Sequence, residues 1–392
     1  MLGADPFLAS LRRHRLAAGL IVLQCALTTV VLVLALAKAG ALHACAIRPS
    51  GLEEAQLAQL MVRGPQDVSA QARERTALGG IDGVVAATPV NQLPFGTEYW
   101  SADFSRAPRG GGGVVPLAIY LGDVDLRRQL GVALRDGRDF QSDEHGVPGV
   151  RDATQVQLDA DAAQRLFPGQ RAVGRTIYLG KRPLRVVGVY APLQAPKPDG
   201  VATMIVPVRY PPAAGTIYLL RLREARLPPA DKVAAALQVA SPHRWISDYR
   251  SLAELRAAYF QHDRWIATGL LVGLTLWLVA TGVGLANLAD ILLQARLRQI
   301  GLCRALGARS AQIRWQLRRE NLLLASAGAV AGLALLHLLL HAWPWLGMQL
   351  ETGGLALQGL AVGLMVLTGQ CAMWPITREA DAVPLTGGMR AA

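Results

Sequence analysis

The sequence predicts an α-helical membrane protein with four transmembrane helices and a large mixed α/β extracytoplasmic domain between helices one and two. Three observations support this fold class. Four apolar runs exceed the roughly 18 residues that a membrane-spanning helix needs. More than 200 residues of mixed helical and strand patterning separate the first two runs. Seven arginines lie between the second and third runs, at 296, 298, 304, 309, 314, 318 and 319.

The first apolar run follows Arg12, Arg13 and Arg15, as a signal peptide would. Its apolar stretch is longer than the roughly 7 to 15 residues of a signal-peptide core, so we interpret it as a helix. The predicted order is a cytoplasmic N-terminus (1–15), helix one (16–38), the periplasmic domain (39–263), helix two (264–289), a cytoplasmic segment (290–320), helix three (321–341), a periplasmic loop (342–354), helix four (355–375) and a cytoplasmic tail (376–392).

The distribution of positive charge sets this orientation, because short cytoplasmic segments are enriched in Lys and Arg. The arginine-rich 290–320 segment is therefore predicted to be cytoplasmic, and the 342–354 loop, which has no Lys or Arg, periplasmic. The net charge of +12 does not indicate nucleic acid, because residues 43–263 hold 26 basic and 22 acidic side chains. Lipid headgroups and an acidic partner surface are the expected counter-charges. Cys45, the one cysteine of the outer domain, is predicted to be a buried free thiol.

Local patterns predict several elements of the outer domain. Apolar spacing favours a helix over 52–61, and a turn leads into a strand over 80–88. Asp159 is expected to cap a short helix that follows a strand over 154–158, and two further strands cover 176–179 and 184–190. The proline-rich stretch 191–212 is interpreted as an extended connector. Ser251 and Glu254 form a capping-box pattern that opens a helix near Leu252. If this helix runs unbroken to Leu288, it is longer than a membrane is thick, and the excess forms a rigid stalk.

The sequence argues against catalysis on this chain. It contains no G-x-x-x-x-G-K-[ST] phosphate-binding motif and neither H-E-x-x-H nor G-x-S-x-G. The acidic residues Asp123 and Asp125 and the cluster at 143–145 are expected to be solvated loop side chains. His337 and His341 share a helix face, but no carboxylate or cysteine completes a metal site, so we predict no metal. Few polar residues interrupt the apolar runs, which gives ion-coupled transport little support.

The 290–320 segment carries the most specific motif. Its apolar residues can form one side of a short helix, Gly307 can end that helix and Ser310 can cap the next. The motif residues are Arg298, Gln299, Ile300, Gly301, Arg304, Ala305, Leu306, Gly307 and Ala308. This pattern resembles the segment that contacts the ATPase in FtsX/MacB-type ABC transporter permeases. Gln299, where the family often has Glu, and Cys303, where a basic residue is common, depart from the pattern.

The outer domain carries a second match to the same family. Residues 131–140 are followed in order by Arg165 to Gly169, Val173-Gly174, Leu179-Gly180 and Val186 to Val189. This series resembles the periplasmic core domain of MacB-type permeases. The resemblance covers nearly the whole chain, and it is weakest in the C-terminal tail.

The resemblance implies a permease subunit in the cell inner membrane, driven by a separate ABC ATPase that binds ATP and Mg²⁺. It further implies mechanotransmission, in which ATPase movement drives the periplasmic domain to export or extract a drug, peptide or lipid-linked substrate. Expected partners are a second copy or a paralogous permease, membrane lipids, and a periplasmic adaptor with an outer-membrane channel. Small residues for helix packing or dimerisation are Gly269, Gly273, Gly328, Gly332, Gly359 and Gly363.

Other functions stay open at this point. Within the family, an FtsX-like regulator of cell-wall hydrolases works without transporting cargo. From a different class, the alternative is a membrane-anchored sensor or adaptor. A membrane-anchored hydrolase is a third and weaker alternative, because no catalytic motif supports it.

Overall fold

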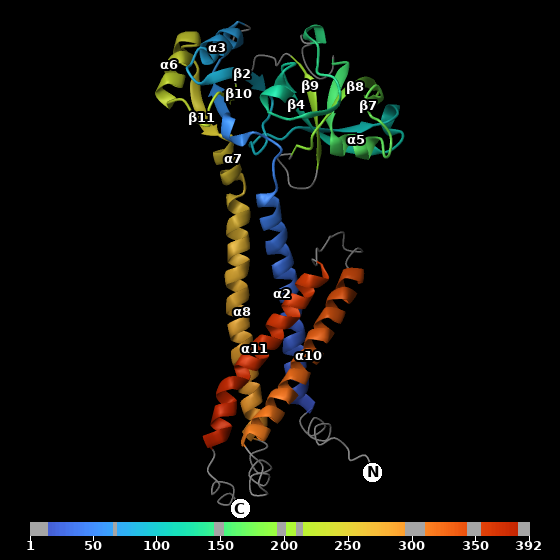
Figure 1. Cartoon of the computed structure of the whole chain (residues 1–392), viewed down its shortest axis with the longest axis vertical. Helices are drawn as coiled ribbons and strands as arrows, with labels where there is room; N and C mark the ends of the chain where they lie inside the picture. Colours follow the sequence, from blue (N-terminus) through green and yellow to red (C-terminus); the bar gives the residue numbers. More distant parts are fainter. Residues whose placement is uncertain are drawn as a thin grey trace, which may run out of the picture. The chain divides into compact units, whose positions relative to one another are not determined.

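The structure is a computed structural model that describes residues 15–65, 69–144, 153–193, 201–208, 215–294, 310–342 and 354–382 (Figure 1). The chain forms two compact units. One consists of residues 1–46 and 263–392, and the other of residues 47–262. We call them the membrane unit and the outer unit, and each is described by itself.

The membrane unit contains four long helices: α2 (Arg15–Ile47), α8 (Gln261–Gln294), α10 (Ser310–Ala342) and α11 (Leu355–Ala382). All four are long and apolar enough to cross a membrane. The predicted fold class is therefore confirmed, with four such helices and an α/β domain between the first and second. The helices pack through an apolar core that includes Ile21 and Leu32 of α2, Leu285 of α8, Leu336 of α10 and Met365 of α11. Cys45, predicted to be a buried free thiol, is half-buried near the end of α2.

The outer unit begins with a four-stranded antiparallel sheet of order β11-β1-β10-β2. Its strands are β1 (Leu57–Arg63), β2 (Val84–Val90), β10 (Gly215–Leu222) and β11 (Trp245–Ser251). Helices α3 (Ala70–Gly79) and α6 (Ala230–Ala240) supply Leu78, Val233 and Leu237 to a core shared with β1, β2 and β10.

The helix predicted over 52–61 was wrong. After a short 3-10 turn, η1 (Glu54–Gln56), this stretch is β1, the strand between β10 and β11. Four successive residues from Leu57 to Leu60 are buried, because both faces of the strand are covered. A strand buried on both faces loses its alternation and cannot be told from a buried helix by periodicity.

A seven-stranded sheet forms the second half of the outer unit, in the order β5-β8-β6-β9-β4-β3-β7. An additional pairing of β7 with β8 rolls it into a barrel. The strands are β3 (Ser101–Ser105), β4 (Val114–Gly122), β5 (Leu134–Gly137), β6 (Gln155–Asp159), β7 (Thr176–Leu179), β8 (Arg182–Tyr190) and β9 (Ala202–Pro207). The short helices are α4 (Leu126–Gln129), α5 (Ala160–Leu166), η2 (Pro108–Gly110) and η3 (Ser142–Glu144).

The two sheets of the outer unit confirm several predicted elements and correct another. Strands β2, β6, β7 and β8 lie where strands were predicted, and Asp159 caps α5 by accepting a hydrogen bond from the Ala162 amide at 2.5 Å. The stretch 191–212 was predicted to be an extended connector. It contains β9, which pairs with both β4 and β6 and is buried along its whole length. Its prolines lie outside the strand or at its last residue, so they do not interrupt the ladder.

The run from Leu252 to Leu288, considered above as one unbroken helix, is helical except at one residue, Phe260. Ser251 makes both bonds of its capping box with Glu254 and opens α7 (Leu252–Tyr259). Helix α7 ends at Phe260, whose ψ of 3° departs from helical geometry, and α8 begins at the next residue. The Phe260 side chain is buried, with 1% of the residue exposed.

Candidate functional site

The predicted ATPase-contacting segment, Arg298 to Ala308, lies outside the described residues. The structure places only its two ends, since α8 ends at Gln294 and α10 begins at Ser310. Figure 1 shows both ends at the same end of the helix bundle. Leu293 of α8, Leu317 of α10 and Met373 of α11 share an apolar cluster there. Three helices therefore pack together beside the ends of the predicted segment.

A second contact at this end holds α10 against α11. The guanidinium of Arg318 lies over the ring of Trp374, 5.4 Å from its centroid. The amide of Gln370 donates to the Arg318 carbonyl at 3.3 Å. Cation–π contacts of this kind contribute about 0.5 to 1 kcal/mol at exposed sites.

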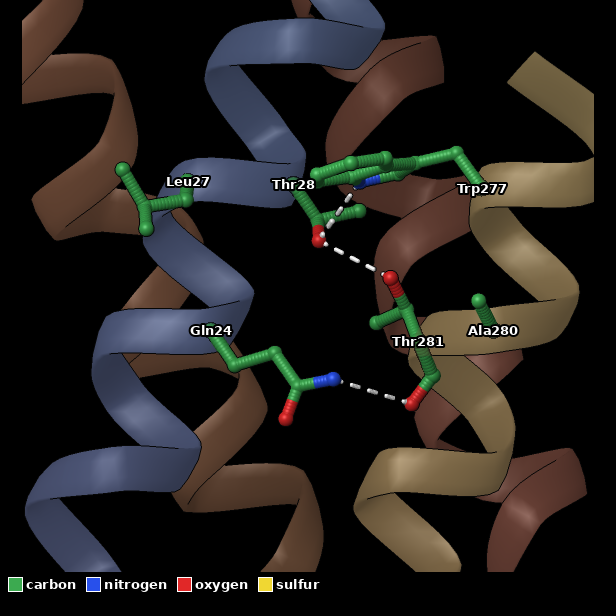
Figure 2. A pocket seen from close by; sticks show the side chains of 6 residues that line it. All are labelled: Gln24, Leu27, Thr28, Trp277, Ala280 and Thr281. Atoms are coloured by element: carbon green, nitrogen blue, oxygen red, sulfur yellow. Dashed lines mark hydrogen bonds between the residues drawn. The ribbon is translucent and has the colours of Figure 1, made fainter. Parts of the chain in front are cut away.

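Polar side chains join α2 to α8 in the middle of the bundle (Figure 2). Thr28 and Thr281 hydroxyls are 3.1 Å apart, and Trp277 donates its indole N–H to Thr28 at 3.2 Å. Gln24 donates to the Thr281 carbonyl at 3.3 Å. These groups line a cavity of about 240 Å³ together with Leu27 and Ala280. Because Leu27 and Trp277 are each 47% exposed, the cavity opens on the outside of the single bundle.

The predicted small residues occupy two different environments. A Cβ at Gly328 would meet the Val22 carbonyl of α2 at 2.8 Å, and one at Gly332 would meet the Ala26 carbonyl at 2.5 Å. These two glycines therefore allow α10 to approach the α2 backbone. At Gly269, Gly273, Gly359 and Gly363, no described atom lies within 4 Å of the corresponding Cβ position, and all four residues are exposed.

The junction between β11 and the stalk is a dense set of contacts within the outer unit. Arg256 of α7 forms an ion pair with Glu54 at 2.5 Å, donates to the Arg48 carbonyl, and lies over the ring of Phe95 at 5.6 Å. Phe95 contacts Tyr259 and Phe260, each with a ring-centroid distance of 6.0 Å. We call Arg48, Glu54, Phe95, Arg256, Tyr259 and Phe260 the stalk clasp.

Sequence reasoning did not identify the stalk clasp. Its members come from three separate stretches of the chain, so no local spacing connects them. Phe95 adopts a φ of 65°, in the left-handed region that a bulky residue rarely occupies. Pro94 and Gly96 on either side of Phe95 are typical of a tight turn, and the Gly96 amide donates to the Leu93 carbonyl at 3.0 Å.

The acidic residues that were expected to be solvated are mostly paired, and that expectation was wrong for Asp123 and Glu144. Asp123 is 9% exposed and forms an ion pair with Arg75 at 2.5 Å. The Glu144 side chain is 8% exposed and pairs with Arg138 at 2.5 Å. The Arg138 hydrogen bond helps to hold the pKa of Glu144 below its usual value, against the effect of burial. Arg75 and Arg138 neutralise these two carboxylates. The sequence analysis did not consider these arginines as partners.

His337 and His341 lie on α10. The ring of His337 contacts the Leu333 carbonyl of its own helix, with Nδ1 2.8 Å from that oxygen. In the described part of the chain, no group of three His, Cys, Asp or Glu side chains is arranged to hold a metal ion.

Burial raises the pKa of Asp159, Tyr120 and Tyr190 in the barrel, and Asp159 is the carboxyl among them. Asp159 is buried, and burial raises its pKa to about 6 although the Ala162 and Thr203 hydrogen bonds act in the opposite direction. Its second oxygen accepts from the Thr203 amide at 2.7 Å and hydroxyl at 3.0 Å. Asp159 thus caps α5 and ties it to β9, which is a structural role.

Four long apolar helices and a large α/β unit between the first two define the class of multi-pass membrane proteins with an extramembrane domain. The sequence profile described as "MacB-like periplasmic core domain" matches residues 39–239, and the profile described as "FtsX-like permease C-terminal" matches residues 271–376. The chain therefore belongs to the FtsX/MacB-type family of ABC transporter permeases.

Individual relatives agree with this assignment. The chain is 25% identical over 221 residues to the macrolide export ATP-binding/permease protein MacB of Chromobacterium violaceum, covering 54% of this chain and 33% of that protein. It is 28% identical over 202 residues to the probable syringafactin export ATP-binding/permease protein SyfD of Pseudomonas syringae pv. tomato, covering 47% and 29%. The chain thus spans about a third of the length of these relatives.

Among solved structures, the chain is similar to the periplasmic region of MacB from Actinobacillus actinomycetemcomitans. That match has 14% identity and a TM-score of 0.35, and it covers 53% of this chain and 94% of the other. The extracellular domain of the ABC-type transporter YknZ from Gram-positive bacteria gives a TM-score of 0.32 at 14% identity, covering 49% and 100%.

Proposed function

We propose that this chain is the permease subunit of an ABC transporter that converts ATP hydrolysis on a separate ATPase subunit into movement of its outer unit. The observation that carries the proposal is the stalk clasp. It binds the first turns after β11 to the outer unit, and α8 continues two residues later into the membrane unit. A helix transmits displacement along its axis, whereas a flexible linker would absorb it.

The ATPase would bind Arg298 to Ala308, and ATP with Mg²⁺ would belong to that subunit. The basis is the resemblance of these residues to the family's coupling segment and the joint packing of α8, α10 and α11 beside its ends. The excess of arginine there orients the segment to the cytoplasm and the outer unit to the periplasm of a bacterial inner membrane. This chain would contribute no catalytic group.

A second permease chain is the further partner. The exposed pairs Gly269/Gly273 on α8 and Gly359/Gly363 on α11 offer close approach to another helix, while Gly328/Gly332 already pack against α2. The cargo would be a drug, peptide or lipid-linked molecule expelled from the periplasmic side, as the export functions in the relatives' names suggest. A periplasmic adaptor and an outer-membrane channel would complete the export path.

Inserting two glycines between Phe260 and Gln261 tests the lever directly. We expect cargo export to be lost while the ATPase still co-purifies and hydrolyses ATP, because force from α8 no longer reaches the stalk clasp. A matched insertion between Gly112 and Gly113, in the loop before β4, is the control and should leave export intact. Export that survives the Phe260 insertion would refute the lever.

Binding of the ATPase needs its own test. Leu306→Arg should abolish co-purification of the ATPase, because it places a charge in the predicted docking segment. Ala311→Arg, at the start of α10, is the control and should retain the ATPase. Retention of the ATPase by both variants would show that the segment is not the docking site.

A further inference from the structure

Two arginines near the start of α10 are each stacked on a tryptophan. The guanidinium of Arg318 lies 5.4 Å from the centroid of the Trp374 ring on α11, and that of Arg319 lies 5.5 Å from the centroid of the Trp315 ring. Arg318 and Arg319 follow Trp315 by three and four residues, so the three side chains share one side of α10. Trp315 is 65% exposed and Trp374 54%. We call these four residues the arginine–tryptophan patch.

The patch lies where apolar sequence gives way to polar sequence. Arg318 and Arg319 come shortly before the apolar run that begins at Leu322, and Trp374 ends the run that begins at Leu355. Helix α10 begins and α11 ends at the same end of the bundle (Figure 1). The ends of membrane-spanning runs mark the level of the lipid headgroups, where tryptophan is enriched. The patch therefore lies at the headgroup level of one leaflet.

Hydrogen bonds between α10 and α11 hold the patch in place. The Gln370 side-chain amide donates to the Arg318 carbonyl at 3.3 Å, and the Asn321 side-chain amide donates to the Gly369 carbonyl at 2.9 Å. Asn321 is buried, so the second bond is shielded from solvent. Both bonds fix the backbone of Arg318 beside the turn that carries Trp374. The stacked guanidinium is thus pre-organised, which lowers the entropy that it loses on binding a ligand.

The two guanidiniums have no anionic partner in the part of the chain that the structure describes. No described carboxylate forms an ion pair with Arg318 or Arg319, and the Nε of Arg318 has no hydrogen-bond acceptor. Residues 310–320 hold three arginines and one glutamate, so the start of α10 carries a net positive charge. A guanidinium stays charged in proteins and presents its N–H donors in a planar fork that matches the oxygens of a phosphate group.

We propose that the arginine–tryptophan patch binds the phosphate headgroup of an anionic phospholipid, with Arg318 and Arg319 donating to the phosphate oxygens. A lipid fits this patch better than an acidic protein surface, because the exposed tryptophan rings at the ends of the apolar runs place the guanidiniums beside the headgroups. Basic sites between membrane helices recognise anionic lipids in this way. This inference needs the membrane bundle but does not depend on the proposed transport function.

Native mass spectrometry of the full-length chain in detergent tests the proposal. The chain is titrated with dioleoyl phosphatidylglycerol, and with dioleoyl phosphatidylcholine as the zwitterionic comparison. We expect the wild type to bind phosphatidylglycerol in preference. Arg318→Gln should weaken this binding at least about ten-fold, because it removes charge-assisted hydrogen bonds to the phosphate. Trp374→Leu keeps every charge and should weaken binding about three-fold, because the guanidinium loses the ring that orients it.

Arg15→Gln is the matched control. It removes the same charge from the exposed start of α2 and should bind phosphatidylglycerol like the wild type. Thermal unfolding without added lipid shows whether each variant is folded. If Arg318→Gln is unfolded, Arg318→Lys decides instead, because it keeps the charge but loses the planar fork and should still weaken binding. Binding by Arg318→Lys equal to that of the wild type would then overturn the proposal.

Two further arms separate the lipid from other anions. Inorganic phosphate at the same concentration should not displace phosphatidylglycerol, because the headgroup is held at the patch by its membrane anchor. Displacement by phosphate, equal binding of the two lipids, or equal losses in Arg15→Gln and Arg318→Gln would each overturn the proposal. Unchanged lipid binding by Arg318→Gln together with loss of ATPase co-purification would assign the arginines to a protein contact and overturn it as well.

Discussion

The guanidinium of Arg244 lies 3.3 Å from the carboxylate of Glu74, and neither side chain has any exposed surface. Arg244 also donates to the Val62 carbonyl and the Thr216 hydroxyl, each at 3.1 Å, and Tyr218 donates to Glu74 at 2.5 Å. The pair therefore fastens α3 and the start of β11 to the middle of the four-stranded sheet.

Arg244→Met is expected to destabilise the protein by about 3 to 5 kcal/mol, because it leaves the Glu74 carboxylate buried without its counter-charge. Denaturant unfolding followed by circular dichroism measures the change. The double variant Glu74→Leu/Arg244→Met should recover part of the loss, since it removes both buried charges. Arg171→Ala, which breaks the exposed pair with Asp136, is the control and should barely move the transition. A small effect of Arg244→Met would contradict the structural role of the pair.

Gly332→Val should disrupt the packing of α10 against α2. The new side chain would have to displace the α2 backbone, since a Cβ alone would lie 2.5 Å from the Ala26 carbonyl. Gly363→Val makes the same chemical change on an open face of α11 and should preserve the fold of the single chain. Thermal unfolding in detergent compares the two, and a Gly332→Val variant as stable as Gly363→Val would argue against this contact.

The sequence predicts features that depend on neighbouring residues better than features that depend on residues far apart in the chain. Asp159 and Ser251 were identified as helix caps because each bonds to an amide within three residues. Strand β1 was missed because burial on both faces removes the alternation on which strand prediction depends. Strand β9 was missed because the stretch around it is rich in proline.

Contacts between residues far apart in the sequence could not be predicted either. Arg244 and Glu74 are 170 residues apart, and only the completed sheet brings them together. Small-residue spacing marked all six glycines alike, but it did not distinguish the two that pack against α2 from the four on open faces. That distinction depends on helix rotation within the bundle, which no single helix specifies.

Asp159 should make stability depend on pH. Its pKa is about 6 in the folded protein, against 3.8 for an ordinary aspartate, so the folded state holds this proton more tightly than the unfolded state. The resulting stabilisation is fully present below about pH 4 and is lost as the pH rises through about 6, with a limit of about 3 kcal/mol.

Unfolding free energies of the wild type and of Asp159→Asn, measured from pH 4 to pH 8, check this dependence. The difference between the two proteins should change most between pH 4 and pH 6, because the asparagine does not titrate. A difference that stays constant over this range would contradict a raised pKa at Asp159.

The Thr28–Thr281 contact should contribute modestly to the joining of α2 and α8. A double-mutant cycle with Thr28→Val and Thr281→Val is expected to give a coupling energy of about 0.6 kcal/mol, the average for hydrogen bonds between membrane helices. Steric trapping or reversible unfolding in mixed micelles measures it. Thr275→Val is the control, since Thr275 bonds to Leu271 of its own helix. Coupling of Thr275 to Thr28 equal to that of Thr281 would contradict a specific contact.

Arg256 is the residue whose loss should separate ATP hydrolysis from export most cleanly. Its guanidinium contacts Glu54, the Arg48 carbonyl and the Phe95 ring, so Arg256→Met removes the ion pair, the backbone bond and the cation–π contact together. The aromatic contacts of Phe95 with Tyr259 and Phe260 remain, and the outer unit should stay folded. We expect the ATPase to remain bound and active while export falls at least about ten-fold, a change equivalent to about 1.4 kcal/mol.

Arg250→Met is the matched control for this variant. Arg250 forms its ion pair with Asp248 on the same strand, β11, so its loss leaves α7 attached to the outer unit. Parallel assays of ATP hydrolysis and cargo release in reconstituted vesicles compare the two variants. Equal export by Arg256→Met and Arg250→Met would mean that the stalk clasp transmits no force. Loss of ATPase binding by Arg256→Met alone would mean that its effect reaches the cytoplasmic segment by a route other than the lever.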